Sequence, residues 1–181
     1  MSTFRITDTT TMSIAAAVTA EFDRETAITR RLLARTPFAA TEWKPHGKSM
    51  TLGRLASHLA EIPSWGGASL QLAELDIAPV DGPPYVPPTF ASVDELLALF
   101  DQHVAESRPV LAGMSDDDFQ RPWTMLMGGA TIFTMSRIDL VRTWVLNHLV
   151  HHRGQFSVYL RLQDIPLPGI YGPSADDPGS M

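Results

Sequence analysis

The chain has 181 residues, of which 44% are hydrophobic and 19% are charged, and its formal net charge is −6. This length and composition fit one folded domain with a substantial core and exclude a disordered chain. The negative charge argues against a nucleic acid or an anionic membrane surface as the main partner. Because the chain has no cysteine, disulfides, thiolate metal sites and cysteine nucleophiles are excluded, and a transition-metal site must use histidine, carboxylate or water.

The sequence shows no sign of a membrane-spanning or export segment. No apolar run approaches the roughly 20 residues that cross a bilayer. Residues 1–12 are rich in threonine and lack the charged start and apolar centre of a signal peptide. We therefore expect a cytoplasmic protein with a single domain over residues 1–181, loosely ordered at 1–12 and 174–181.

Two amphipathic helices are predicted in the first third of the chain. The first spans about 13–35 and stops before Pro37, although its apolar residues follow the helical period poorly. The second spans about 49–62 and is expected to end at Pro63. Its apolar stripe has the spacing 3, 4, 3 and consists of Leu52, Leu55, Leu59 and Ile62. His58 borders the same face.

A proline-rich segment separates the second helix from the third. Five prolines between residues 79 and 88 are incompatible with a helix or a central strand, so we predict a stiff surface loop that can border a site. Ser92 and Glu95 then have the spacing of a capping box, which begins the third helix. A short acidic turn is expected at 115–119.

A hairpin and a long helix complete the predicted elements. Gly128-Gly129 lies between residues 123–127 and 130–135 and indicates a two-residue β-turn. Ser136 caps the fourth helix, which continues to about residue 163. We therefore predict an all-α fold, a four-helix bundle with a short β-hairpin between the third and fourth helices.

The fourth helix carries two histidines on its apolar stripe. This stripe consists of Val141, Val145, His148, His152, Phe156 and Tyr159. Imidazoles in a bundle core are costly unless their nitrogens are bonded, and two rings one turn apart can meet one ion. His58 of the second helix is the candidate third ligand. Three protein ligands leave a position open for water or substrate, as in catalytic metal sites.

Other interpretations of these histidines remain open. They can be core residues that bond the backbone or one another. His148 and His151 are also spaced to share an ion, although His151 lies off the stripe. His46 and His103 have the character of a loop residue and an exposed helix residue.

Two of the four neighbours of the histidines, Glu61 and Gln155, have two interpretations each. Trp144 lies one turn before His148 and is expected to wall one side of a pocket. Glu61 is either a hydrogen-bond partner of His58 or a solvated side chain. Gln155 either approaches a ligand or lies at the helix edge, and Arg153 is interpreted as a surface or helix-end contact.

Several site classes are excluded by the absence of their motifs. There is no His-Glu-x-x-His of zincin proteases and no Glu-x-x-His of ferritin-like di-iron sites. No glycine-rich phosphate-binding loop follows a predicted strand.

Two stretches resemble signatures of the DinB-like (YfiT-like) family of metal-dependent enzymes. Residues 43–63 read WKPHGKSMTLGRLASHLAEIP and resemble its second-helix signature. Residues 147–155 read NHLVHHRGQ and resemble its last-helix signature, with support from YLRL at 159–162 and PLPGIYGPSAD at 166–176. The resemblance extends over about residues 13–177.

The resemblance implies a four-helix bundle with one metal-binding histidine on the second helix and two on the fourth. These positions match His58, His148 and His152. Such proteins usually hold zinc or nickel and commonly form dimers. Some relatives transfer low-molecular-weight thiols such as bacillithiol or mycothiol, or isomerise thiol adducts.

We therefore expect a metal-dependent enzyme that transfers a low-molecular-weight thiol to an electrophile or hydrolyses a small substrate. The expected cofactor is a divalent ion, zinc or nickel, and the expected partners are a small-molecule substrate, a thiol and a second copy of the chain. The alternative is a non-catalytic, stress-related protein that binds a metal or a small ligand.

Overall fold

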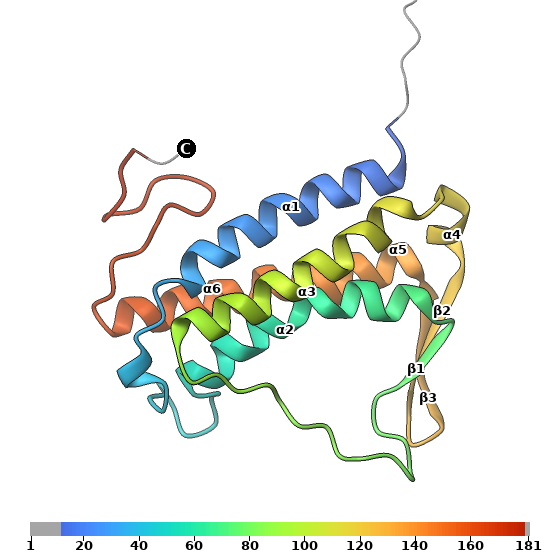
Figure 1. The fold of residues 1–181 in the computed structure, drawn as a ribbon, viewed down its shortest axis with the longest axis horizontal. Coiled ribbons are helices and arrows are strands. Elements are labelled where there is room, and N and C mark those ends of the chain that lie inside the picture. The colour runs from blue at the N-terminus through green and yellow to red at the C-terminus, as the bar shows by residue number, and fades with distance from the viewer. Residues whose placement is uncertain (1–11, 180–181) are drawn as a thin grey trace, which may run out of the picture.

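Four long helices lie side by side in the computed structural model, which describes residues 12–179 (Figure 1). They are α1 (Ile14–Leu33), α2 (Leu52–Gln71), α3 (Val93–Gly113) and a last helix made of α5 (Arg137–Leu140), η2 (Val141–Asn147) and α6 (His148–Leu162). The predicted four-helix bundle is confirmed. Most of the expected loose N-terminal tail, residues 1–11, and the final residues 180–181 lie outside the described part of the chain.

The order of the helices around the bundle decides which side chains can meet. α1 and α2 both pack against α3 and α6 and lie diagonally across from each other. Fully buried side chains from all four long helices form the core, among them Phe22, Leu59, Phe100 and Phe156. Because α2 and α6 are neighbours, His58 can meet the histidines of the last helix. None of the described helices is both long and apolar enough to span a bilayer.

The helix starts follow the polar residues that the sequence offers. Ser13, Thr51, Ser92 and Ser136 each accept a hydrogen bond from the backbone N–H three residues later. The predicted cap at Ser92 is confirmed. The Glu95 carboxylate accepts from the N–H of Ala91, one residue earlier than a capping box requires.

The predicted end of the second helix at Pro63 is wrong, because α2 continues through this proline to Gln71. The neighbouring helix α3 supplies polar partners at this point. Ser107 Oγ donates to the Pro63 carbonyl at 2.7 Å and accepts from the Gly67 N–H at 3.0 Å. A Cβ on Gly67 would lie 2.8 Å from Ser107 Oγ, so glycine permits this close approach. Tertiary hydrogen bonds therefore carry the helix past a residue that breaks most helices.

A small sheet covers one end of the bundle. The predicted hairpin is confirmed as β2 (Pro122–Met127) and β3 (Ala130–Ser136), and its turn glycines have φ of 60° and 78°. A third strand, β1 (Glu74–Asp76), pairs in parallel with β2 and was missed. Its three residues are too few for a periodic pattern. The Asp76 carboxylate accepts from the N–H groups of both turn glycines, at 3.0 and 2.7 Å.

The remaining short elements join these units. η1 (Phe38–Ala40) is one 3₁₀ turn after α1, and α4 (Asp116–Gln120) is the predicted acidic turn before β2. The proline-rich segment between β1 and α3 has no regular structure after residue 82 and runs on the α2 side of the bundle to the start of α3 (Figure 1). It carries Tyr85 towards α2.

The last helix differs from the uniform α-helix that we predicted, because η2 (Val141–Asn147) is π-helical. A π-turn accommodates one more residue than an α-turn and is frequent at functional sites. This wide segment ends immediately before His148. The residues that follow it, His152 and Arg153, are both buried and lie against different neighbouring helices.

Candidate metal centre

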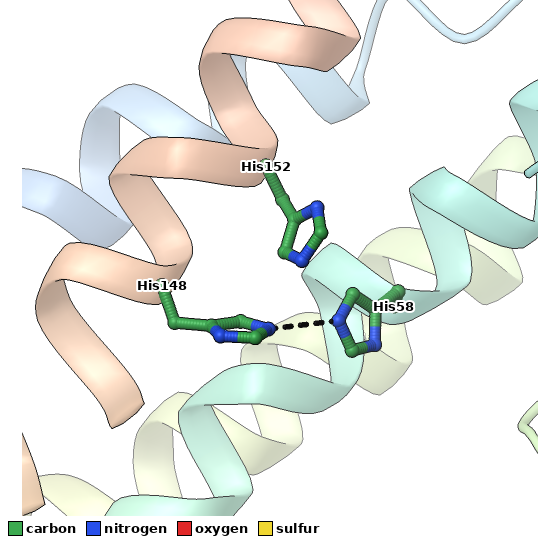
Figure 2. Close-up of side chains that lie close together, drawn as sticks. All are labelled: His58, His148 and His152. Carbon is green, nitrogen blue, oxygen red and sulfur yellow. Dashed lines mark hydrogen bonds between the residues drawn. The ribbon is translucent and has the colours of Figure 1, made fainter. Parts of the chain in front are cut away.

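The three histidines expected to share a site lie together between α2 and α6. Figure 2 shows His58 on α2 facing His148 and His152, which project from successive turns of α6. The Nε2 atoms of His58 and His148 are 3.0 Å apart. One nitrogen from each ring lies within 4.8 Å of the others. The spacing of the stripe therefore located this cluster correctly, while occupancy by a metal stays a prediction.

The outer nitrogens of two rings face hydrogen-bond acceptors, which leaves their other nitrogens available as ligands. His152 Nδ1 donates to Gln155 Oε1 at 2.8 Å. His58 Nδ1 lies 3.5 Å from Glu61 Oε2. A proton held at Nδ1 puts the lone pair on Nε2, which is how protein groups orient metal-binding imidazoles. Gln155 and Glu61 were each expected either to contact the site or to be solvated at the helix edge. The structure favours contact with the site for both residues.

Burial, together with the neighbouring imidazoles, lowers the pKa of His148 to about 4. Burial also lowers the pKa of His152 to about 4, although its hydrogen bond with Gln155 opposes this shift. Both rings are therefore neutral at pH 7. A neutral imidazole is the form that binds a metal.

The cluster fits a divalent cation in donor type and spacing. A tetrahedral ion with nitrogens at roughly 2.0–2.1 Å sets them about 3.3 Å apart. The observed 3.0 Å between two Nε2 atoms is close to that value. His58 Nδ1 and Glu61 Oε2 have no hydrogen-bond partner among the described residues, so a small rotation that joins them would complete a carboxylate–histidine–metal arrangement.

Glu61 is the buried carboxylate behind this cluster, with a residue exposure of 8%. Tyr85 donates a hydrogen bond to its Oε1, and an Arg54 nitrogen lies 3.8 Å from its Oε2. Burial raises the pKa of Glu61, but the nearby His58 ring, the hydrogen bond from Tyr85 and the charge of Arg54 together outweigh burial, so the net shift of the pKa is downward. Burial and the bond to Glu61 raise the pKa of Tyr85 to about 12. Tyr85 therefore stays protonated at neutral pH, and the proline-rich loop supplies Glu61 with a hydrogen-bond donor.

Aromatic rings cover the other side of the cluster. Trp144 stacks on His148 with centroids 6.1 Å apart, which confirms the expected wall. Phe133 of β3 stacks in turn on Trp144. The ring centroid of Trp65 lies 5.4 Å from that of His58 and 5.3 Å from that of His148. Trp65 belongs to the part of α2 beyond Pro63. The prediction that this helix ends at Pro63 therefore gave no indication that Trp65 lies beside the histidines.

The remaining histidines stay outside the cluster. His151 is exposed, although its ring lies 4.8 Å from that of His152. His46 is exposed in a loop, as expected. His103 is partly buried, contrary to expectation, and its Nδ1 lies 2.8 Å from the Ala60 carbonyl of α2. Its partner is therefore a backbone group in the same stretch of α2 that contains Pro63.

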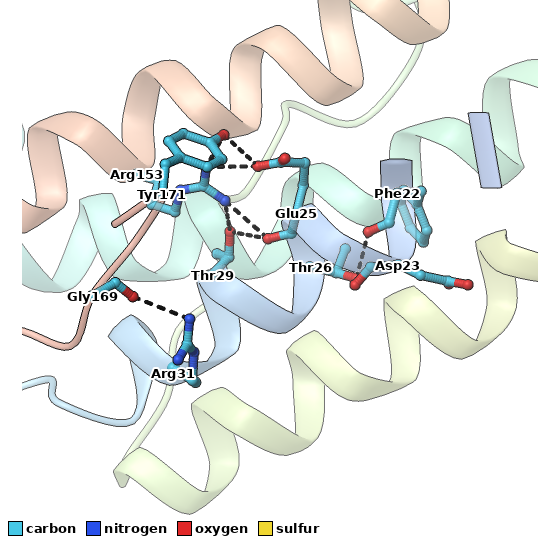
Figure 3. Close-up of polar contacts among 9 residues, drawn as sticks. All are labelled: Phe22, Asp23, Glu25, Thr26, Thr29, Arg31, Arg153, Gly169 and Tyr171. Carbon is cyan, nitrogen blue, oxygen red and sulfur yellow. Dashed lines mark hydrogen bonds and ion pairs between the residues drawn. The ribbon is translucent and has the colours of Figure 1, made fainter. Parts of the chain in front are cut away.

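Arg153 is buried, with an exposure of 1%, so its interpretation as a surface contact is wrong. Its guanidinium donates to Glu25 Oε2 at 2.6 Å, to the Glu25 carbonyl at 3.0 Å and to Thr29 at 3.3 Å (Figure 3). The Tyr171 hydroxyl donates to the same Glu25 oxygen at 2.6 Å. The inward-facing Glu25, Thr26 and Thr29 also explain why the apolar period of α1 is poor.

Three converging imidazoles beside a buried carboxylate are suited to hold one divalent ion with a coordination position left for water or a small ligand. The tryptophans and Glu61 limit the space around that position. The described residues near the cluster do not include a phosphate-binding glycine loop.

Comparisons with known proteins agree with the fold and identify the family. The DinB superfamily model matches residues 21–156. A DinB-like protein from Bacillus cereus ATCC 10987 superposes with a TM-score of 0.64 at 20% identity, covering 88% of this chain and 98% of its own. The DinB-like protein YjoA from Bacillus subtilis gives 0.66 at 16% identity, with 85% and 97% covered. No curated protein matches the chain in sequence.

Proposed function

This chain belongs to the DinB superfamily, and from that premise we propose that it is a metal-dependent enzyme acting on a small molecule. His58, His148 and His152 would hold one divalent ion, zinc or nickel. The observation that carries the proposal is the convergence of three ring nitrogens within 4.8 Å of one another. We further propose that the reaction transfers a low-molecular-weight thiol to an electrophile.

The residues around the site each have a defined task in this reaction. Glu61 and Gln155 hold the rings of His58 and His152 so that their inner nitrogens face the ion. When bound, a divalent ion lowers the pKa of a thiol or water placed in the open position, so that a nucleophile exists at neutral pH. The tryptophans keep that position partly shielded from solvent.

The proposed transfer balances without an oxidant or reductant. The thiol sulfur forms a new bond to carbon, the leaving group departs with the electron pair of the broken bond, and the thiol proton passes to solvent. The preference for a thiol over water rests on the resemblance to thiol-transferring members of the family. Hydrolysis of a small substrate is the competing reaction at the same site.

The test joins metal analysis with a conjugation assay. We expect about one zinc or nickel ion per chain by mass spectrometry, together with turnover of a fluorogenic haloalkane by at least one thiol in a panel. His148→Ala should lose both, while folding by circular dichroism is retained. His151→Ala is the matched control, because this exposed neighbour lies outside the cluster, and it should keep both.

Two results would contradict the proposal. Protein that contains no metal, and takes up none on titration, would remove its basis. Stoichiometric metal with neither thiol transfer nor hydrolysis would favour the non-catalytic, ligand-binding alternative.

A further inference from the structure

A cavity of about 410 Å³ lies beside the candidate metal centre, between the start of α2, the turn η1 and the proline-rich loop. It is lined by Arg54 and Ser57 of α2, by Phe38 and Glu42 near η1, and by Pro87 and Phe90 of the loop. Arg54 lies one helical turn before His58, an axial rise of about 6 Å. The histidines do not line the cavity, but Arg54 joins the two places, because it lies one turn from His58 and 3.8 Å from Glu61.

The guanidinium of Arg54 has hydrogen-bond donors that its present contacts do not fully use. Its side chain is 27% exposed, and its nitrogens lie 3.3 Å from Ser57 Oγ, 3.4 Å from Tyr85 OH and 3.8 Å from Glu61 Oε2. All three contacts are long for hydrogen bonds of a charged group, which usually lie at about 2.7–2.9 Å. A guanidinium can donate two parallel hydrogen bonds to a carboxylate in addition to such weak contacts.

The opposite part of the cavity is apolar. Phe38 and Phe90 approach with ring centroids 6.2 Å apart, and prolines of the loop line the cavity beside them. Phe38 is 45% exposed, although large aromatic side chains are usually buried. One cationic group and an aromatic wall in the same cavity suit a molecule with an anionic end and an apolar body.

We propose that this cavity binds the electrophilic substrate of the proposed reaction, and that this substrate is a small carboxylic acid with an apolar body. The inference rests on the proposed function, because it assigns the substrate class of the same site. Arg54 holds the carboxylate, and the apolar body packs against Phe38 and Phe90. The carboxylate end of the substrate, with the carbon attached to it, then lies nearer to His58 than the apolar body does. Glu42, which is exposed at the cavity, opposes the ligand charge.

The test compares a carboxylate probe with its neutral isostere. Dissociation constants of 4-phenylbutyrate and 4-phenylbutanamide are measured by calorimetry for the metal-loaded protein. We expect the acid to bind the wild type about tenfold more tightly than the amide, as suits a charge-assisted pair. In Arg54→Gln the two should bind within about twofold of each other, and Arg54→Lys should keep part of the preference.

Further variants separate charge from packing. Phe38→Ala should weaken the acid and the amide alike, whereas Glu42→Gln should strengthen only the acid. Arg24→Gln is the matched control, because this exposed arginine of α1 does not line the cavity. Circular dichroism of each variant establishes that it is folded.

The outcomes distinguish this inference from the proposed function. An acid preference that survives Arg54→Gln overturns the inference. Acid binding that vanishes on chelation and ignores Arg54 also overturns it, because the carboxylate then coordinates the ion, while the metal site stands. An Arg54-dependent preference in protein that holds no metal supports the cavity and refutes the metal-dependent function.

Discussion

Two buried polar clusters meet on α6, and they differ in how completely their hydrogen bonds are satisfied. Arg153 donates to two oxygens of Glu25 and to Thr29, and Tyr171 completes the set. One residue earlier, His152 belongs to a cluster in which His58 and His148 present nitrogens to each other. His58 Nδ1 and Glu61 Oε2 have no hydrogen-bond partner within the described chain.

This contrast teaches how to separate a structural polar cluster from a binding one. Burial of a charge is tolerated when the protein itself satisfies it, as around Arg153. Burial of polar atoms that lack a partner, such as His58 Nδ1 and Glu61 Oε2, is costly unless another partner arrives. The saturated cluster should therefore control stability, and the unsaturated cluster should control binding.

The largest expected effect is on the saturated cluster. Arg153→Met leaves the Glu25 carboxylate buried without its cation and should lower the free energy of unfolding by roughly 3–5 kcal/mol in urea titrations. Arg31→Met, which removes one contact of an exposed arginine to the Gly169 carbonyl, should cost less than about 1 kcal/mol. A similar small loss in both variants would show that the buried pair is not structural.

Metal addition should stabilise the protein through the histidine cluster alone. At a free zinc concentration 100 times the dissociation constant, the free energy of unfolding should rise by about 2.7 kcal/mol. His152→Ala should abolish this increment, while Arg153→Met should retain it on its lower baseline. Thermal unfolding with and without chelator measures both. An increment that persists in His152→Ala would place the ion elsewhere.

Glu61→Gln should weaken metal binding by about 10- to 100-fold, because the neutral amide orients His58 less firmly. Competition with a fluorescent zinc chelator measures the change. Glu42→Gln removes an exposed carboxylate away from the histidines and should leave metal affinity unchanged. Equal affinity in the wild type and Glu61→Gln would show that the 3.5 Å contact has no bearing on the ion.

The smallest expected effect concerns the edge of the saturated cluster. Tyr171→Phe removes the hydroxyl that bonds Glu25 and should cost about 1 kcal/mol, since solvent reaches this side chain and replaces part of the bond. Tyr159→Phe is the control, because its hydroxyl makes only a 3.5 Å contact with the Met50 carbonyl. Urea titration of both variants should show a smaller change for Tyr159→Phe; a larger one would contradict this view.

The parts of this fold that could be predicted depend on the spacing of residues close together in the sequence. The 3, 4, 3 stripe of α2, the cap at Ser92 and the Gly128-Gly129 turn each depend on a few neighbouring residues, and each occurs as expected. The histidine cluster was predictable for the same reason, since His148 and His152 share a stripe. His58 borders the apolar stripe of a distant helix, and the resemblance to the family then supported it as the third ligand.

The missed parts depend on contacts between distant segments. α2 passes Pro63 because Ser107 bonds its carbonyl, and β1 exists because β2 offers it a partner. Arg153 is buried because Glu25, 128 residues away, neutralises it. A pattern of neighbouring residues cannot predict contacts between such distant segments. For Arg153, however, the carboxylate of Glu25 on the inner face of α1 indicated that a buried cation was needed.

The π-helical stretch before His148 has a consequence for how this architecture tolerates change. Deleting one residue within 141–147 can convert the wide turn to an ordinary α-turn without rotating the elements on either side, because the π-turn holds the one extra residue. The histidines would then keep their partners on α2, whereas Trp144, which lies within the π-helical segment, would change its position relative to His148 and Phe133. We expect such a shortened chain to keep its zinc affinity but change its tryptophan fluorescence; the opposite pattern would mean that the extra residue sets the orientation of the imidazoles rather than that of Trp144.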